Sequence, residues 1–424
     1  MFSLSHPGLS PGRGEPIPTV NHSTPSSRVD ATGDFLQGLT KFRKFGKKTR
    51  VKSINGITYF ANQFWTPRQR QGHRLQEVSY RGCFKPQLPA FFIERLTRPG
   101  DVVYDPFMGR GTTPVEAALK GRIPYGNDIN PLSRALTEPR IHPPTLAQIE
   151  VRLAEIPWDE FVDIEHEELL AFYHPVTLSR LEGLRTWLLS RIDAGLDDPV
   201  DRWIRMVAVT RLTGHSARFF SGYTLPPNQA TTLDGQRKIN ARKNLTPPEK
   251  DVRAILEWKS KKFLSQGAPK PDDALLLTGA AEKTLQIPDA AVTLTVTSPP
   301  FLDVVNYESD NWLRCWFLGI DPKTVNISQY RGIKEWQPFI KKTLAELARV
   351  TRPGGHVAFE VGEVKYGKIR LEEHVVAATE GLPFATLGVM IVRHEFTKTS
   401  QCWGIANNSG GTNSNRVVLL QKKG

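Results

Sequence analysis

The sequence predicts an α/β fold built on a doubly wound, mostly parallel sheet. One observation is an apolar strand at residues 101–105 that runs through a turn containing Gly109 and Gly111 into a segment of good helix formers. This order of strand, tight loop and helix is typical of nucleotide-type binding sites. A second observation is the apolar, β-branched run Val292–Thr297, which has the length and composition of a buried strand.

The remaining elements follow along the chain. Residues 1–35 are rich in Ser, Pro and Gly and lack apolar periodicity, so we expect disorder there. Residues 36–138 would form a basic N-terminal part and the first half of the sheet. Residues 139–270 show helical apolar spacing and predict a mostly helical insertion. Residues 271–424 would complete the sheet and end in an antiparallel strand pair.

The glycine turn indicates the kind of ligand. Gly109 and Gly111 would let the backbone approach a ligand closely, and a second short strand ends in Asp128, about 17 residues beyond Gly111. An acid at this distance accepts hydrogen bonds from ribose hydroxyls in doubly wound sheets. The loop has neither the third glycine of a dinucleotide fingerprint nor a Gly-Lys-Ser/Thr ending. A smaller nucleoside ligand without a pyrophosphate therefore fits better than NAD or a nucleoside triphosphate.

The strand Val292–Thr297 ends in Ser298, Pro299, Pro300 and Phe301. Two consecutive prolines stop the strand, so the carbonyls there lack ladder partners and can face a ligand. Such a platform could hold a planar amino group by hydrogen bonds and stack the ring that carries it. A strand stopped by prolines and followed by an ordinary loop is the alternative.

Taken together, DPFMGRGTT at 105–113, the acid of NDINP at 127–131 and TSPPF at 297–301 resemble the S-adenosylmethionine-dependent DNA amino methyltransferases. The serine before the two prolines resembles the cytosine-N4 branch more than the adenine-N6 branch. The resemblance implies a Rossmann-like methyltransferase sheet and S-adenosyl-L-methionine as the cofactor. It covers residues of about 85–135 and 275–424, with target recognition expected in the insertion between them.

The resemblance also assigns roles to residues. It implies that Asp128 holds the cofactor ribose and that the platform, Ser298, Pro299, Pro300 and Phe301, holds the flipped base. The residues implied to surround the methionine end of the cofactor are Lys85, Pro86, Asp105, Pro106, Phe107, Gly109, Gly111, Thr112 and Thr113. The acid that the family usually places after the next strand is replaced by Ala280 and Ala281, which leaves Glu282 as a candidate contact to the adenine.

The implied reaction is a direct methyl transfer without a covalent enzyme intermediate. The Ser298 Oγ and the Pro299 carbonyl are the predicted acceptors for the protons of the amino group, because its nitrogen must become pyramidal before it attacks. None of Cys83, Cys315 and Cys402 lies in the Pro-Cys setting of a cytosine-C5 enzyme. Tyr307, Trp312, Trp316 and Phe317 could line the pocket or belong to the core.

Three alternatives stay open. One is methylation of adenine N6, one is methylation of RNA or protein amino groups, and one is a DNA-binding protein with a degenerate methyltransferase fold. The serine at position 298 and the intact glycine loop favour the cytosine-N4 enzyme over all three.

The charge of the chain predicts an anionic partner, double-stranded DNA. The chain has 56 Lys and Arg against 43 Asp and Glu, a formal net charge of +13 and a pI near 9.6. Residues 41–85 carry 12 basic residues and 1 acidic residue, and residues 201–270 carry 14 and 5. The predicted DNA contacts, all in the insertion, are Arg218, Arg237, Lys238, Arg242 and Lys243.

Other features of the sequence bear on location and cofactors. We expect no membrane segment, no signal pattern and no metal site, because no long apolar run and no metal-ligand spacing of His or Cys occurs. Three widely spaced cysteines suit a reducing cytosol. The expected location is the bacterial cytoplasm and nucleoid, or the nucleus or an organelle of a eukaryote. A monomer and a dimer are both open.

Overall fold

The computed structural model describes residues 31–65, 72–160, 162–224, 231–300, 307–325, 330, 332–364, 369–393 and 414–424. Its centre is a nine-stranded sheet in the order β1-β2-β10-β11-β7-β6-β3-β4-β5. The strands are β1 (Arg50–Ile54), β2 (Ile57–Asn62), β3 (Val102–Asp105), β4 (Ile123–Asp128), β5 (Leu275–Thr278), β6 (Val292–Thr297), β7 (Thr351–Val361), β10 (Phe384–Arg393) and β11 (Ser414–Lys422). A two-stranded ribbon, β8 (Glu363–Val364) and β9 (Ile369–Arg370), follows β7.

Strand directions confirm the predicted sheet. Neighbours from β5 through β4, β3 and β6 to β7 are parallel, whereas β11 is antiparallel to both β7 and β10. The β2 strand pairs in parallel with β10, and β1 returns antiparallel to β2. The carboxyl ends of β2, β3, β4, β6, β7 and β10 therefore lie at one edge of the sheet, which we call the carboxyl edge.

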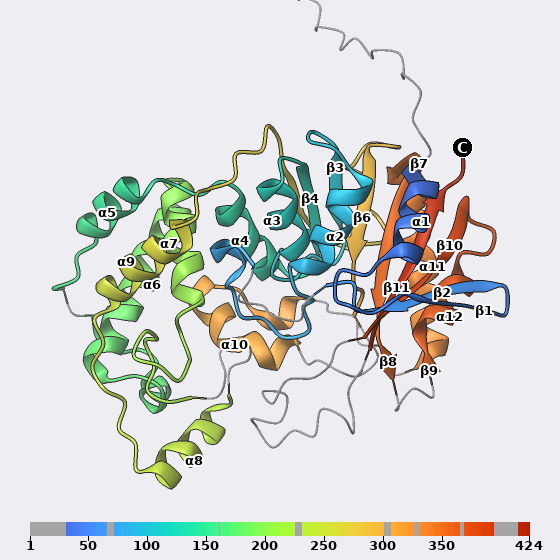
Figure 1. Ribbon diagram of the computed structural model, residues 1–424. Helices are drawn as coiled ribbons and strands as arrows, with labels where there is room; N and C mark the ends of the chain where they lie inside the picture. The colour runs from blue at the N-terminus through green and yellow to red at the C-terminus, as the bar shows by residue number, and fades with distance from the viewer. Residues whose placement is uncertain are drawn as a thin grey trace, which may run out of the picture.

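Helices cover both faces of this sheet (Figure 1). One face packs on α1 (Ala31–Lys41), α2 (Gln87–Leu96) and α3 (Thr112–Leu119), and the other on α11 (Ile333–Val350) and α12 (Leu371–Ala378). Successive side chains of a strand point to opposite faces of the sheet. In β11, Val417 and Leu419 pack with α1 and α2, whereas Val418 and Leu420 pack with α11 and α12.

The chain between β4 and β5 forms a helical lobe beside the β5 end of the sheet (Figure 1). It contains α4 (Pro131–Ile141), α5 (Leu146–Glu155), α6 (Pro175–Asp193), α7 (Pro199–Val209), α8 (Leu233–Lys243) and α9 (Val252–Leu264), and α10 (Tyr307–Leu318) packs into the same apolar cluster. Trp203 of α7 is fully buried there and donates to Ser260 Oγ of α9 at 3.0 Å. The predicted helical insertion is confirmed.

Two local expectations differ from the structure. Helix α1 begins at Ala31, inside the segment 1–35 for which we expected disorder, because Phe35 and Leu39 are buried against α2. Residues 1–30 lie outside the described residues. Arg-Pro-Gly-Gly at 352–355 has the composition of a turn, yet it lies within β7, where the register with β6 shifts between Val292 and Leu294. A search of the described residues finds no helix with the length and apolarity to cross a bilayer.

Candidate active site

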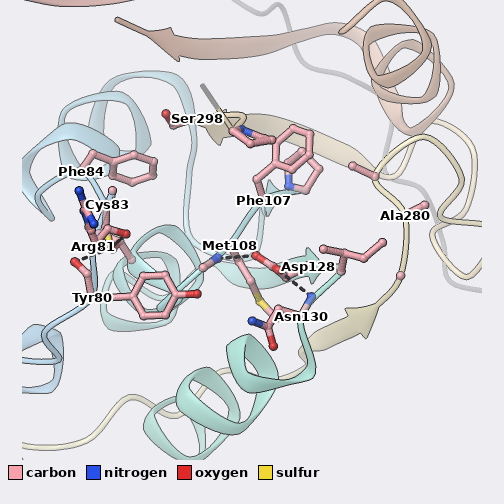
Figure 2. A pocket seen from close by; sticks show the side chains of 18 of the residues that line it. Tyr80, Arg81, Cys83, Phe84, Phe107, Met108, Asp128, Asn130, Ala280 and Ser298 are labelled. Atoms are coloured by element: carbon pink, nitrogen blue, oxygen red, sulfur yellow. Dashed lines mark hydrogen bonds between the residues drawn. The ribbon is translucent and has the colours of Figure 1, made fainter. Parts of the chain in front are cut away.

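A pocket of about 880 Å³ lies at the carboxyl edge, and Figure 2 shows it from close by. Its walls come from segments far apart in the sequence: residues 80–84, 106–109, 128–130 and 279–282, together with Thr112, Ser298, Pro300 and Phe339. The structure thus brings together seven of the predicted residues: Pro106, Phe107, Gly109, Thr112, Asp128, Ser298 and Pro300.

The two glycines of the turn have different tasks. Gly109 lines the pocket with φ +50°, and its N–H donates to Asp128 Oδ2 at 2.8 Å. Gly111, with φ +77°, begins α3, and a Cβ added there would overlap the side chain of Thr137 on α4. Gly111 therefore allows α3 and α4 to pack closely, whereas only Gly109 brings backbone to the pocket, in contrast to our expectation for both.

Threonines after the turn divide in the same way. Thr112 lines the pocket, whereas Thr113 is fully buried and donates to the Val296 carbonyl at 3.0 Å. Thr113 thus ties the start of α3 to the end of β6, two residues before Ser298.

Asp128 stands at the end of β4, where its carboxylate is already oriented. Its Oδ1 accepts from the Asn130 N–H at 2.9 Å, and its Oδ2 accepts from Gly109. Burial raises the pKa of Asp128, and the two backbone N–H groups oppose this rise. A carboxylate has about four acceptor sites, so beside these bonds Asp128, which lines the pocket, could accept hydrogen bonds from ligand hydroxyls.

Asp105 ends β3 and connects it to β6. Its Oδ1 accepts from Thr297 Oγ1 at 2.6 Å and from the Phe107 N–H at 3.1 Å. Its Oδ2 is buried without a hydrogen-bond partner among the described residues. Burial raises the pKa of Asp105 to about 7. A buried acceptor without a partner beside a pocket suits a ligand that donates hydrogen bonds there.

Ser298 leaves β6 at the pocket wall, and its hydroxyl lowers the pKa of a carboxyl that our sequence analysis did not single out, that of Glu360. Thr297 pairs with Phe359 in the β6–β7 ladder, which places the residues that follow each of them side by side. Glu360 is buried, and burial raises its pKa to about 7 while the Ser298 hydroxyl, as donor, opposes that rise. An acid inside the apolar strand 356–361 was the signal that could have revealed it.

The proline platform is held from behind. Pro299 is buried, and Pro300 lines the pocket while its carbonyl accepts from Trp336 Nε1 at 2.9 Å. Trp336 itself is fully buried in α11. Phe301 lies outside the described residues. The described aromatic residues that line the pocket are Tyr80, Phe84, Phe107 and Phe339, and the rings of the last two have centroids 5.7 Å apart.

The wall at residues 80–84 is fastened by three arginines. Arg110, the residue between the two glycines, donates to the carbonyls of Val78 and Phe84 at 2.5 and 3.2 Å. Arg140 of α4 donates to the carbonyl of Leu75 at 2.9 Å, and Arg314 of α10 donates to that of Ser79 at 2.8 Å. All three guanidinium groups are buried. Their side chains therefore shape the pocket without lining it.

Lys85 and Pro86 come directly after this wall. In this segment the last residue that lines the pocket is Phe84, so neither Lys85 nor Pro86 is part of the lining. Pro86 instead caps the start of α2. Burial lowers the pKa of Lys85. On the opposite side, Ala280, Ala281 and Glu282 all line the pocket, which places the candidate adenine contact within it.

The other predicted aromatics belong to the core. Phe317 is buried in the helical lobe, Trp312 donates to the Thr231 carbonyl at 3.2 Å, and Trp316 packs on His166 with centroids 5.4 Å apart. The side chain of Tyr307 lies outside the described residues. No cluster of His, Cys, Asp and Glu able to hold a metal ion occurs within the described part of the chain.

The five predicted DNA-contacting cations lie on the helical lobe, away from the pocket. Arg218 stacks over the Trp258 ring at 4.8 Å, and Lys243 over the Tyr223 ring at 4.7 Å. The other three belong to α8, where Arg237 pairs with Asp234 at 3.3 Å and where Lys238 and Arg242 are exposed.

Comparisons with known proteins show which proteins this chain resembles. Residues 37–136 match the model of a family described as DNA methylase (N6_N4_Mtase). The type II methyltransferase M.MjaII of Methanocaldococcus jannaschii is 34% identical over 125 residues, which are 29% of this chain and 24% of that protein. M.BsoBI of Geobacillus stearothermophilus is 23% identical over 328 residues, which are 67% of this chain and 63% of that protein. Among solved structures, TrmN from Thermus thermophilus aligns with a TM-score of 0.31 at 14% identity, over 81% of this chain and 50% of that one.

The chain spans about a quarter of the length of M.MjaII and of M.MvaI from Kocuria varians, to which it is 30% identical over 121 residues. The matched segment 37–136 contains the glycine turn, Asp105 and Asp128. In that segment, the chain is similar to the S-adenosylmethionine-dependent DNA amino methyltransferases.

Proposed function

We propose that this protein transfers a methyl group from S-adenosyl-L-methionine to the exocyclic N4 of a cytosine in double-stranded DNA. One observation supports this most: Ser298, beside buried Glu360 in the β6–β7 ladder, lines the same pocket as the Gly109 turn and Asp128. A group that can accept amino protons and a nucleoside-type binding loop thus share one cavity.

The residues present fit this cofactor. Asp128 has free lone pairs for ribose hydroxyls, and the Gly109 backbone permits close approach. The buried Asp105 Oδ2, which has no partner among the described residues, suits the ammonium of a methionine. Glu282 lies on the side where an adenine would rest. When bound, S-adenosyl-L-methionine supplies a methyl group activated by its sulfonium, so that alignment and charge placement are the remaining tasks of the protein.

Ser298 and Glu360 would handle the proton. The amino nitrogen of cytosine must lose one proton as it becomes methylated, and the Ser298 Oγ would accept the hydrogen bond from that nitrogen. As the proton moves to Oγ, the hydroxyl proton of Ser298 passes to the Glu360 carboxylate. Because its pKa is raised to about 7, this carboxylate is a better base than an exposed one while still ionising near neutral pH. The Pro299 carbonyl would accept a hydrogen bond from the second amino proton.

The choice of base and polymer follows from the platform and the charge. Ser298 is a neutral acceptor backed by a carboxylate, which favours cytosine N4, with adenine N6 as the second candidate. A base in a duplex cannot reach this pocket while stacked, so we propose that it is flipped out before methyl transfer. The net charge of +13 supports DNA as the polymer.

Helix α8 supports a role for the helical lobe in target recognition. One face of the helix is anchored: Gln236 Nε2 donates to the Tyr223 carbonyl at 2.8 Å, and Asn240 Nδ2 donates to the Ala171 carbonyl at 2.7 Å. The opposite face carries Arg237, Lys238 and Arg242, all exposed. Figure 1 shows α8 standing out from the lobe. We propose that this outward face enters a groove of the duplex, because a polar helix anchored on one side only leaves its basic side available.

The anchoring of one face of α8 also changes which of the five predicted cations we expect to contact DNA. Lys243 lies on the anchored side, over Tyr223, and Arg218 lies over Trp258. Of the five predicted cations, Arg237, Lys238 and Arg242 are therefore the stronger candidates for contact with DNA.

The product of the reaction tests this function. The protein is incubated with labelled S-adenosyl-L-methionine and duplex DNA, and the nucleosides are separated after digestion. We expect label in N4-methylcytosine. Label in N6-methyladenine would support the second candidate, and label only in RNA or protein would refute the proposal.

A further inference from the structure

A second basic surface lies at the opposite end of the sheet from α8. Residues 42–50, which we call the basic loop, connect α1 to β1 and expose Arg43, Lys44, Lys47, Lys48 and Arg50. The sequence contains no Asp or Glu between positions 34 and 77. Within the part of the chain that the structure describes, no carboxylate forms an ion pair with the first two of these residues, with Lys48 or with Arg50.

The backbone of this loop is held in place from inside. Asn62, buried at the end of β2, donates through Nδ2 to the carbonyls of Phe42 and Lys47, both at 3.1 Å, and to Thr49 Oγ1 at 3.0 Å. Thr49 in turn donates to the Leu39 carbonyl at 2.7 Å. The loop therefore presents its cations from a backbone held by hydrogen bonds, and none of the four bonds just named uses a Lys or Arg side chain.

An aromatic cluster fastens the same loop to the sheet. The Phe42 ring packs on Phe64 and Phe91, with centroids 5.2 and 6.0 Å apart. Phe91 belongs to α2, the helix that directly follows the pocket wall. The basic loop is thus part of the same rigid layer as that wall.

Topology places the basic loop at the carboxyl edge, where the pocket opens. The β2 strand runs parallel to β10, and through β11 and β7 it has the direction of β6, whose carboxyl end carries Ser298. Arg50 pairs with Ala61 at the carboxyl end of β2, so the residues before Arg50 lie at this edge. From β6 to β1 the sheet order has five steps, and at about 4.8 Å a step the separation is roughly 24 Å.

We infer that the basic loop binds the phosphate backbone of the same duplex whose target base enters the pocket, on one side of the target. A rise of about 3.4 Å for each base pair converts the separation into roughly seven base pairs. This inference rests on the proposed function. We favour a DNA backbone as the partner because a regular polyanion complements an ordered row of cations. No acidic residue occurs in the 42 consecutive positions 35–76 that contain this row.

The test compares two double variants that remove the same charge. Lys44→Gln with Lys48→Gln changes the basic loop, and Arg98→Gln with Lys423→Gln changes two exposed cations at the other edge of the sheet, before β3 and after β11. Equilibrium binding is measured by fluorescence anisotropy on duplexes that carry the target with three or with twelve flanking base pairs on each side, over a range of salt concentrations.

On the long duplex we expect the loop variant to bind about tenfold more weakly than the wild type at 0.15 M salt, with a slope of log K against log salt smaller by about 1.8. On the short duplex, which does not reach the loop, we expect the loop variant and the wild type to bind alike. The edge variant should match the wild type on both. Equal binding of the loop variant and the edge variant to the long duplex would overturn the inference, and so would an equal loss on both duplexes.

Methyl transfer to the short duplex, measured in parallel, separates this inference from the proposed function. If the wild type and the loop variant both methylate the short duplex and bind the long duplex alike, only the inference fails. If the wild type neither methylates nor binds any duplex, both fail. Binding of poly-glutamate by the wild type as tight as binding of the long duplex would identify an acidic protein as the partner instead.

Discussion

At the scale of single residues, the proposed chemistry depends on Ser298 and Glu360. The serine lies at the pocket wall, and the carboxyl lies behind it in the ladder between β6 and β7. A hydroxyl backed by a buried carboxylate accepts a proton more readily than a hydroxyl that faces water, since the carboxylate can take up the charge. The two residues should therefore fail in different ways when they are changed.

Ser298→Ala removes the acceptor and leaves the cavity. We expect the rate of methyl transfer in a single turnover to fall by about 10²-fold or more, because the lost contact acts at the reacting nitrogen. Affinity for the cofactor, measured by calorimetry, should stay within about twofold of the wild type. An unchanged single-turnover rate would remove Ser298 from the mechanism.

Glu360→Gln keeps the shape of the side chain and removes its ionisation. In the wild type, the single-turnover rate should rise with pH through about 7, where Glu360 loses its proton, and in the variant it should be low and flat through that range. A variant that keeps both the rate and the pH profile of the wild type would contradict the role of Glu360.

The stability of the folded protein should change with pH in the opposite direction from the rate of methyl transfer. The folded pKa of Glu360 is raised from 4.5 to about 7, so its stabilising contribution is complete below pH 4.5 and is lost as the pH rises to 7. Above pH 7 the ionised, buried carboxylate destabilises the fold, by up to about 3 kcal/mol. Glu360→Gln should therefore unfold at a higher denaturant concentration than the wild type at pH 8, measured by urea titration, and show little difference at pH 4.5. A variant less stable than the wild type at pH 8 would contradict this account.

Sequence patterns predicted Ser298, Asp128 and Gly109 because each follows a strand in a recognisable order. Glu360 and the three arginines behind the pocket wall were missed because their partners are far away in the sequence, on neighbouring strands and helices. For Gly111 the residue was found but its task was not, since only the packing of α3 on α4 shows what the missing Cβ would overlap.

At the scale of elements, the contact between α3 and α4 positions the glycine turn. Gly111→Ala should destabilise the protein by about 2–4 kcal/mol in denaturant titrations, because the new methyl group overlaps Thr137 and φ is +77°. Gly195→Ala is a matched control: φ is +69° there, but the space is open, so we expect about 1 kcal/mol. Equal losses in the two variants would show that packing against Thr137 has no part. Partial recovery in the double variant of Gly111→Ala and Thr137→Ala would support it.

Helix α8 offers a second test at this scale. Lys238→Ala with Arg242→Ala changes its outward face, and Arg253→Ala with Lys261→Ala removes two exposed cations from α9 of the same lobe. We expect the α8 variant to lose about 10- to 100-fold in kcat/KM on a target duplex, with cofactor affinity unchanged, whereas the α9 variant should lose less than threefold. Equal effects would mean that the lobe contributes charge and no specific contact.

The hairpin of β1 and β2 shows why one element escaped prediction. Asn55 and Gly56 form the turn, with φ of +51° and +77°, and Asn-Gly between two strands is a strong hairpin signal. Our sequence analysis interpreted residues 41–85 only by their charge and did not predict this hairpin. What no local pattern could show is that β2 pairs with β10, more than 320 residues later, and so carries the basic loop to the carboxyl edge.

For the whole molecule, the class of the sheet was predictable, mostly parallel with an antiparallel pair at the end, because strand and helix patterns follow one another with clear periodicity. The sequence predicted that the lobe is mostly helical, but it did not predict how its helices pack on one another. Its apolar cluster includes α4 and α10, so the lobe is joined both to the glycine turn and to the chain that follows the proline platform. This connection gives a physical route by which binding of DNA to the lobe could affect the pocket.

The central claim is that a cofactor in this pocket faces Ser298. A crystal structure of the protein with S-adenosyl-L-homocysteine and a target duplex tests it most directly. We predict the ribose hydroxyls on Asp128, the sulfur beside the Gly109 turn, and a flipped cytosine whose N4 lies between that sulfur and the Ser298 Oγ. A cofactor bound elsewhere, or one whose sulfur points away from Ser298, would contradict the account.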